Sequence, residues 1–366
     1  MKILLFFAHP SKYHAFKHTI NALIRNGHKV ELLIIKKDIL EDLVQTEDWN
    51  YKNIFPNGRK IRGIPVYLGA SINFIRTIAI LLKYVWNKKY DLFFTDDLLT
   101  IVGRLKNVPT IHFQDDDLSA VPESSIILGT ASVVLSPKST NLGRFNKKKI
   151  PIYTYKELGS LHPRYFSPDY RIIKEINREE NKYFLIRLVS HKSTHDVNKK
   201  GISNDKLKIL IDILEKKGKI FISSEREIPK EYDKYRLKIE PRDIAHVLFY
   251  AQLFISDSQT MTSEAAMLGV PSIRYNDFVG KLSVMEEKEK EYELTFGFRS
   301  NEFERLILKL NELLEMSNLK EEFQERRQKM LSRCIDLNTF LIWFLENFPK
   351  SAEILKENPD YQLKFR

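Results

Sequence analysis

The stretch SDSQTMTSEAAMLGVP at residues 256–271 directly follows the apolar run AQLFI. Serine, aspartate and threonine favour helix N-termini because their side-chain oxygens accept hydrogen bonds from amides that the helix leaves unpaired. Four hydroxyl residues within seven positions exceed what one cap needs. Free amides and the helix dipole attract anions. The stretch therefore predicts either a phosphate or diphosphate site at a strand-to-helix junction, or a capped helix with surplus hydroxyls.

A second candidate site is the loop AHPSKYHAFKH, which follows the first apolar run and contains His9, His14 and His18. A histidine can take a proton at neutral pH because its unperturbed pKa is about 6.5. Either His9 or His14 could act as a general base, or each could simply cap or pack the start of a helix. The loop has no GxGxxG pattern, so a nicotinamide cofactor is not expected.

Two histidine pairs have a spacing that can bind zinc. His14 and His18 are four residues apart, as are His191 and His195. A zinc site needs a third ligand, and the sequence offers neither an HExxH motif nor a cysteine partner. We therefore predict no metal site.

Acidic residues follow two of the apolar runs, as Asp96-Asp97 and as Asp115-Asp116-Asp117. Acids at the carboxyl ends of parallel strands face the place where α/β proteins bind ligands. Most of the five acids are expected to cap the next element. We predict that one of them activates an acceptor hydroxyl or orients a histidine, and its position favours Asp116.

Composition narrows the class of protein. A length of 366 residues favours about two domains, and 43% hydrophobic with 29% charged residues is ordinary for a soluble protein. The single cysteine, Cys334, excludes an intramolecular disulfide and favours a reducing cytoplasm. The net charge of +11 comes from scattered lysines without a groove-reading motif. It therefore favours a phosphorylated small molecule over nucleic acid as the partner.

The elements that must position these residues form two series of short apolar runs alternating with helical patterns. The runs lie at 2–8, 29–35, 91–97, 109–116 and 131–137, and then at 182–190, 219–224, 253–258 and 271–276. Such alternation predicts βαβ units and parallel sheets, that is, two Rossmann-like α/β domains. The polar segment at 38–68 is predicted to be an irregular surface excursion.

We place the N-terminal domain at 1–160 and the C-terminal domain at 170–330, joined by a hinge rich in proline. Residues 331–366 contain the aromatic stretch DLNTFLIWFLENFPKS. Its apolar face must be covered, and packing against the N-terminal domain would bury it. The apolar run at 72–86 carries Arg76 and Lys83 on one helical stripe. That run is therefore predicted to be an amphipathic helix that does not span a membrane.

Four segments together resemble the two-domain GT-B glycosyltransferase superfamily, which includes the non-hydrolysing UDP-GlcNAc 2-epimerases. They are MKILLFFAHPSKYHAFKHTINALIRNGHKV, KELGSLHPRYFSPD, SDSQTMTSEAAMLGVPSIRYNDF and DLNTFLIWFLENFPKS. More narrowly, the chain is similar to an archaeal and bacterial domain-of-unknown-function family of predicted glycosyltransferases. The resemblance runs from residue 1 to about 350 and implies two Rossmann-like domains facing a cleft, with the C-terminal helix packed back on the N-terminal domain.

The resemblance also implies where a nucleotide-sugar donor, expected to be UDP-linked, would bind. Its diphosphate would lie over Ser258, Gln259, Thr260 and Met261, and Glu264 would hydrogen-bond the ribose hydroxyls. Arg187, at the end of the run FLIRL, is a candidate phosphate-binding cation because guanidinium can bind phosphate in a bidentate manner. Lys192 is a second candidate in the same loop. No other cofactor is expected.

The leading hypothesis is a metal-independent glycosyltransferase that builds a surface polysaccharide or glycolipid, with a saccharide or lipid-linked acceptor. We expect it in the cytoplasm or at the inner face of the membrane, with peripheral membrane contact. A UDP-sugar 2-epimerase is an alternative, although SDSQTM replaces the SDSGG-type turn of those enzymes and His-Pro-Ser replaces their Arg-Pro-Glu. A CDP-polyol phosphotransferase and a non-catalytic nucleotide-sugar-binding protein are further alternatives.

Overall fold

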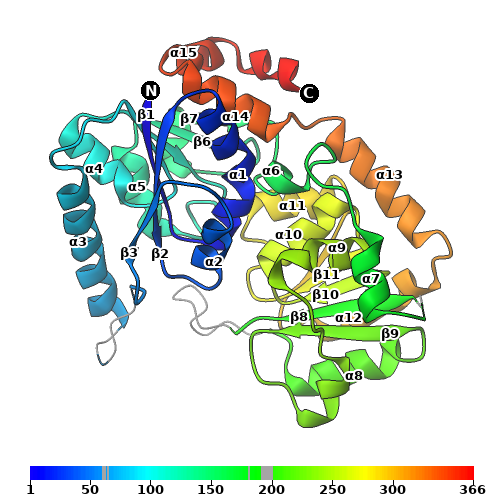
Figure 1. The fold of residues 1–366 in the computed structure, drawn as a ribbon. Coiled ribbons are helices and arrows are strands. Elements are labelled where there is room, and N and C mark those ends of the chain that lie inside the picture. Colours follow the sequence, from blue (N-terminus) through cyan, green and yellow to red (C-terminus); the bar gives the residue numbers. More distant parts are fainter. Residues whose placement is uncertain (60–62, 64–65, 180–181, 191–200) are drawn as a thin grey trace. The chain divides into compact units, whose positions relative to one another are not determined.

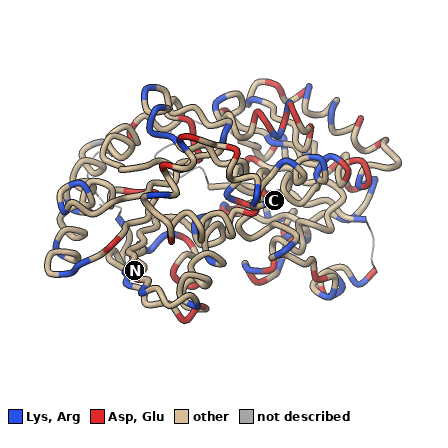
Figure 2. Tube along the Cα trace, turned by 90° about the horizontal axis from the view of Figure 1, so that it is seen from above, with Lys and Arg blue, Asp and Glu red and all other residues tan. Residues whose placement is uncertain are grey.

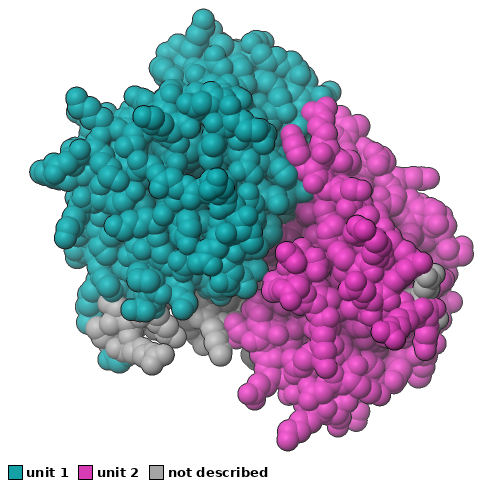
Figure 3. All heavy atoms as spheres, in the orientation of Figure 1, with its two compact units in different colours: residues 1–160, 333–366 teal, residues 161–332 magenta. Residues whose placement is uncertain are grey.

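The computed structural model describes residues 1–59, 63, 66–179, 182–190 and 201–366 (Figure 1). The chain forms two compact units, which Figure 3 distinguishes by colour. Unit 1 contains Met1–Ser160 together with Arg333–Arg366, and unit 2 contains Leu161–Ser332. Unit 1 is therefore discontinuous in sequence, because the C-terminal segment belongs to it.

Unit 1 is built on a seven-stranded parallel sheet in the order β3-β2-β1-β4-β5-β6-β7. Its strands are β1 (Lys2–Phe7), β2 (Lys29–Ile35), β3 (Tyr51–Phe55), β4 (Leu92–Thr95), β5 (Thr110–Phe113), β6 (Val133–Pro137) and β7 (Lys149–Ile152). The apolar runs predicted as strands all form strands. Two were not predicted: β7, and β3, which lies at the sheet edge within the segment expected to be irregular.

Helices cover both faces of this sheet, as strands that are apolar on both sides require. On one face, Ile3, Leu5 and Phe7 pack against α1 (Pro10–Arg25), α2 (Leu40–Gln45) and α14 (Leu337–Glu346). On the other face, Leu4 and Phe6 pack against α3 (Val66–Val85) and α4 (Leu99–Lys106). The short helix α5 (Ser125–Thr130) lies beside α4.

The predicted C-terminal helix packs back on the N-terminal domain, as expected. In Figure 1, α14 lies beside α1, and α15 (Lys350–Glu357) and the 3₁₀ segment Pro359–Phe365 follow it. Asn338 on α14 accepts a hydrogen bond from Thr19 on α1 at 2.9 Å and donates to the Gly159 carbonyl at 2.8 Å. Gly159 approaches α1 so closely that a Cβ atom there would lie 2.0 Å from the Ala15 carbonyl oxygen.

Helix α3 contains the apolar run predicted to be amphipathic. Within the described residues, Leu68–Val85 is the one helical stretch long and apolar enough to cross a membrane by length and composition, with a mean hydropathy of 1.4. Only 22% of that stretch is buried. Most of the helix therefore faces away from the core of unit 1.

Unit 2 contains a five-stranded parallel sheet in the order β12-β11-β10-β8-β9. Its strands are β8 (Tyr183–Leu188), β9 (Lys219–Ser224), β10 (Leu253–Ser256), β11 (Ser272–Tyr275) and β12 (Phe296–Phe298). Its helices include α7 (Tyr170–Ile176), α8 (Asn204–Leu214), α9 (Ile244–Tyr250), α10 (Gln259–Leu268), α11 (Ser283–Lys290), α12 (Phe303–Glu315) and α13 (Leu319–Leu331). The second predicted series of strands is confirmed, and α10 begins directly after β10.

We predict that Phe340→Ala destabilises unit 1 by about 3–5 kcal/mol, the cost of a large cavity in a packed core. Phe340 is fully buried on α14, and its ring lies 5.7 Å from that of Phe344 between ring centroids. Trp49, Trp86 and Trp343 all belong to unit 1, so tryptophan fluorescence during urea unfolding reports on this unit. Leu105→Ala is the control, because Leu105 is 62% exposed and its loss should change the unfolding free energy by less than about 0.5 kcal/mol. Equal effects of the two variants would contradict the packing described here.

Candidate functional site

The strand-to-helix junction in unit 2 uses most of its hydroxyls in its own hydrogen bonds. Ser256 is buried and its Oγ accepts a hydrogen bond from the Ser258 amide at 2.7 Å. Ser258 caps α10, because its Oγ accepts from the Met261 amide at 3.3 Å. Thr262 donates back to the Ser258 carbonyl at 2.6 Å. Within the described residues, the amides of Gln259 and Thr260 have no hydrogen-bond partner, so they are the donors available to an anion.

Asp257, between the two junction serines, holds the neighbouring loops in place. It is 3% exposed, and its carboxylate accepts hydrogen bonds from the amides of Val189 at 2.7 Å and Ile202 at 3.3 Å. Its carbonyl accepts from the Asn276 side chain at 3.0 Å. Asp257 therefore joins the loops after β8 and β11 to the start of α10. Residue type alone predicted only a helix-capping role for an aspartate at this position.

Arg187 lies at the carboxyl end of β8, as predicted, and is already paired. One guanidinium nitrogen donates to Ser223 at 2.6 Å and another contacts the Glu225 carboxylate. Its Nε is buried and unpaired within the described part of the chain. Any phosphate bound here would share Arg187 with Glu225. Lys192 lies outside the described residues.

A buried cation lies behind the first turn of α10. Arg274 on β11 is fully buried, and its guanidinium contacts the Gln259 side chain and, at 2.7 Å, Glu289 on α11. The Gln259 side chain is therefore directed toward the protein interior, and its backbone N–H remains available to a ligand. A charged residue in the middle of the apolar strand SIRY is the signal that could have predicted this ion pair.

The remaining predicted donor-site residues lie on α10. Thr260, Met261 and Glu264 are each partly exposed. Glu264 lies five residues after Gln259, roughly 7 Å along the helix at 1.5 Å per residue. This brings Ser258, Gln259, Thr260, Met261 and Glu264 together on one helix start.

In unit 1, His9 is the N-cap of α1 and accepts a hydrogen bond from the Ser11 amide at 3.2 Å. His9 is an exposed residue, but the protein atoms packed around its ring and the positive charges of Lys156 and Lys12 lower its pKa to about 4. Burial and the charge of Lys17 lower the pKa of His14 to about 4 as well. Both imidazoles are therefore neutral at pH 7 and weakly basic.

The strongest electrostatic feature of unit 1 lies beside His9. Lys12 on α1 is 6% exposed, and its Nζ lies 2.8 Å from Asp115 Oδ1 and 3.9 Å from Asp96 Oδ2. Lys156 contacts the other oxygen of Asp115. Neither lysine was predicted from the sequence. Lys12 lies on the buried face of α1 with Phe16 and Thr19, and a cation on such a face indicates a buried ion pair.

The five predicted acids have different partners. Asp97 accepts a hydrogen bond from the Leu98 amide at 2.6 Å and pairs with Arg59 at 2.7 Å. Asp117 is buried and accepts from the Asn141 amide at 2.8 Å. Neither acid caps the next helix, because α4 has Leu98 as its N-cap without a side-chain cap bond and Asn141 lies 24 residues from Asp117. The expectation that most of the five acids are caps is therefore wrong for these two. Asp116, the acid favoured by position, is partly exposed beside Lys156, while Asp96 has a buried oxygen, Oδ1, without a hydrogen-bond partner among the described residues.

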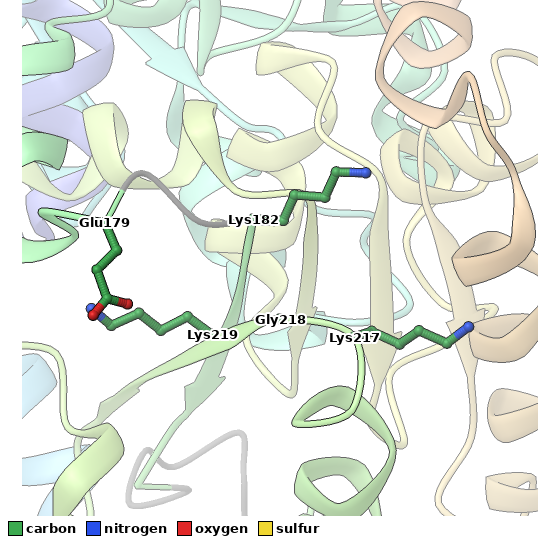
Figure 4. Close-up of a pocket in the computed structure, with 5 residues that line it drawn as sticks. All are labelled: Glu179, Lys182, Lys217, Gly218 and Lys219. Atoms are coloured by element: carbon green, nitrogen blue, oxygen red, sulfur yellow. The ribbon is translucent and has the colours of Figure 1, made fainter.

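Two further features of the described residues bear on ligand binding, namely possible metal ligands and a pocket in unit 2. Within the described ranges, no group of three or more His, Cys, Asp or Glu side chains could hold a metal ion. A pocket of about 530 Å³ in unit 2 is lined by Glu179, Lys182, Lys217, Gly218 and Lys219. It lies at the amino ends of β8 and β9, and Figure 4 shows Lys217 and Lys219 extending in opposite directions, with Lys219 directed toward Glu179. Such diverging side chains do not converge on a ligand.

The charges are mixed along the chain. Figure 2 shows Lys and Arg interspersed with Asp and Glu in the described parts of both units, despite the net charge of +11. A nucleic-acid-binding surface needs basic residues gathered on one face or groove.

The GT-B fold consists of two Rossmann-like α/β domains, each with a parallel sheet, and C-terminal helices that belong to the first domain. The UDP-GlcNAc 2-epimerase from Neisseria meningitidis bound to UDP-GlcNAc matches 98% of this chain over 99% of its own, with a TM-score of 0.60 and 12% identity. Staphylococcus aureus MnaA in complex with UDP matches 96% of this chain over 97% of its own, with a TM-score of 0.69 and 11% identity. MurG from Acinetobacter baumannii matches 95% of this chain over 100% of its own, with a TM-score of 0.62 and 14% identity.

The chain belongs to the family described as "Protein of unknown function (DUF354)", which matches residues 71–325. No curated protein matches it significantly in sequence. The expected GT-B fold is thus confirmed, as is the expected membership of a family of unknown function.

We predict that the stability of unit 1 depends on the ionisation of Asp96. Burial, with the nearby negative charges of Asp97 and Asp115, raises the pKa of Asp96 to about 6 against the opposing effect of Lys12. Because the folded state binds this proton more tightly than the unfolded state, stability falls as the pH rises from about 4 to 6. Asp96→Asn lacks this loss, so its advantage in unfolding free energy over the native chain should grow by about 3 kcal/mol between pH 4 and pH 7. Urea unfolding followed by tryptophan fluorescence measures the difference, and a pH-independent difference would refute the raised pKa.

Proposed function

We propose that this protein is a glycosyltransferase that moves a sugar from a nucleotide diphosphate sugar to a hydroxyl group, without a metal. The observation that carries the proposal is the start of α10, where the amides of Gln259 and Thr260 lie at the carboxyl end of β10. GT-B relatives named for nucleotide-sugar enzymes, or solved with UDP or UDP-GlcNAc, support the choice of ligand.

Stabilisation of the leaving diphosphate is what such a reaction needs most. Displacement at the anomeric carbon develops negative charge on the diphosphate, and fixed amides and a helix dipole stabilise it without reorganising. Arg274 contacts the Gln259 side chain on the interior side of α10, and Asp257 is hydrogen-bonded to the loops that follow β8 and β11. The two amides are therefore held rigidly, as preorganised donors must be.

In this proposal Glu264 binds the ribose. A carboxylate can accept hydrogen bonds from both hydroxyls of a vicinal diol, which suits a side chain about one and a half turns beyond the diphosphate. The product would be a surface polysaccharide or glycolipid, made in the cytoplasm or at the inner face of the membrane.

An epimerase acting on a UDP-sugar is the second candidate, because the similar Neisseria meningitidis structure is that of a UDP-GlcNAc 2-epimerase. The same donor site would serve both reactions. Product analysis separates them, since an epimerase returns an isomeric nucleotide sugar and a transferase releases the nucleotide.

We predict that calorimetric titration with UDP, GDP, CDP, TDP and ADP and their sugar conjugates identifies one nucleotide that binds tightly. Glu264→Ala should weaken its binding roughly 10- to 100-fold, because hydrogen bonds to a charged group contribute about 1.5–3 kcal/mol. The control is Glu315→Ala on α12, whose side chain is 74% exposed and pairs with Lys217. No binding by folded protein would reduce the junction to a capped helix and end the transferase proposal.

We also propose that α3 places unit 1 on a membrane surface, which suits a lipid-linked acceptor. Leu68, Ile72 and Ile75 repeat at helical spacing and are 55%, 38% and 68% exposed. Trp86, just beyond the helix, is 64% exposed, and Lys106 lies 5.0 Å above its ring centroid. An exposed apolar helix face with nearby cations suits the interface of an anionic bilayer.

We predict that the protein sediments with vesicles containing anionic phospholipid at low salt and that Ile75→Asp weakens this binding at least about tenfold. The substitution removes buried apolar area and adds a charge repelled by the lipid headgroups. Leu308→Asp is the matched control, because Leu308 is 70% exposed on α12 of unit 2. Absence of vesicle binding by the native chain would rule out peripheral membrane contact, whereas equal loss in both variants would place the contact elsewhere.

A further inference from the structure

Asp96 is the one acid among the five at the strand ends of unit 1 with a carboxylate oxygen that is both buried and unpaired within the described residues. It follows β4 at the carboxyl edge of the sheet, and its side chain is 13% exposed. A buried oxygen without a donor is costly, and native proteins retain such groups chiefly at functional sites. This oxygen is enclosed by protein, so the carboxylate keeps a hydrogen-bonding position that the described residues leave unused.

Lys12 and a second carboxylate lie beside Asp96, and Lys156 joins the same cluster through Asp115. Lys12 Nζ is 3.9 Å from Asp96 and 2.8 Å from Asp115, and Lys156 contacts the second oxygen of Asp115. Asp97 is the other charged neighbour, and its own carboxylate is taken by Arg59. With Asp96 ionised, the cluster of Lys12, Lys156, Asp96 and Asp115 is neutral. Protonation of Asp96 leaves one net positive charge, and both lysines remain paired with Asp115.

This environment brings the pKa of Asp96 close to neutral pH. Burial raises its pKa to about 6, with Asp97 and Asp115 adding to the rise and Lys12 opposing it. A general base works best when its pKa lies near the working pH, because it must be deprotonated and still bind the proton well. His9 and His14, with pKa values of about 4, satisfy only the first condition.

We propose that Asp96 is the proton acceptor of the reaction, in place of His9, His14 or Asp116, and that its substrate group is an uncharged hydroxyl. In the step, the acceptor oxygen bonds to the anomeric carbon, the bond from that carbon to the diphosphate oxygen breaks, and the hydroxyl proton moves to Asp96. Lys12 is a positioning residue, which keeps Asp96 from binding the proton too tightly.

The pairing of both lysines defines the substrate class. Because Asp115 pairs with both Lys12 and Lys156, and ionised Asp96 balances the remaining charge, the cluster is neutral and gives no net attraction to a phosphate or carboxylate. The site therefore favours a neutral hydroxyl, such as that of a saccharide or polyol, as the group that reacts. This inference rests on the proposed transferase function.

The test uses water as the acceptor, so that no natural acceptor need be known. Release of nucleotide from UDP-GlcNAc, or from the conjugate identified by calorimetry, is measured from pH 5 to 8. We expect the native rate to rise through a midpoint near pH 6 and Asp96→Asn to lower it at least about 100-fold, the lower range for loss of a general base. Nucleotide affinity in that variant should stay within about twofold, and Lys12→Met should move the midpoint to higher pH.

Asp91→Asn is the matched control at the opposite end of β4. Asp91 is exposed and accepts a hydrogen bond from the Lys2 amide at 2.6 Å, which an asparagine oxygen can also accept. Asp96→Asn protein that binds nucleotide and releases it at the native rate would overturn the role of Asp96 while leaving the transferase proposal intact. A native chain that binds no nucleotide sugar would overturn both.

A second measurement does not depend on turnover. In a titration of the protein with ¹³C-labelled aspartate carboxyls, one resonance should titrate near pH 6 and be missing from Asp96→Asn. If the Asp96 carboxyl instead titrates below about pH 4.5, it holds protons too weakly for this role, and the assignment fails whatever the nucleotide data show.

Discussion

Every strand in both sheets is parallel, and the central strands of unit 1 are covered by helices on both faces, which constrains where polar chemistry can lie. Side chains in the middle of such strands are mostly apolar, with the paired Arg274 on β11 as an exception, so charged and hydroxyl groups gather mainly where the strands end. In unit 1 these ends carry Asp96 and Asp115, and in unit 2 they carry Arg187 and Ser256. Both units therefore present polar groups at the carboxyl edges of their sheets, where α/β proteins bind ligands.

Burying charge at these edges has a cost that each unit offsets in the same way. A buried ion is tolerated when it is paired and hydrogen-bonded, because its partners replace the water it has lost. Asp115 pairs with two lysines, and Arg274 pairs with Glu289 and is hydrogen-bonded to Gln259. In each cluster the pairing also fixes a neighbouring group, Lys12 beside Asp96 in unit 1 and Gln259 at the start of α10 in unit 2. Charge pairing thus holds candidate functional groups in defined positions.

The junction after β10 shows how a residue pattern can predict a site correctly in place but not in detail. The surplus of hydroxyls predicted an anion site at residues 256–262, yet three of those hydroxyls form hydrogen bonds within the turn itself. What remains for an anion is mainly backbone, the amides of Gln259 and Thr260. Side-chain types reveal that a turn is unusual, whereas the donors left unpaired depend on how the turn closes.

The sequence by itself determined the two series of strands, the helix at 259–268 and the aromatic C-terminal helix, because these follow from local periodicity and capping. It did not reveal β3, β7 or β12, whose short edge sequences lack a continuous apolar run. The choice among five acids was decided by tertiary structure alone. Lys12 and Asp115 are 103 residues apart and Lys156 lies 41 residues further on. A carboxylate's proton affinity depends on neighbours within a few ångströms, and only the folded chain brings these together around Asp96.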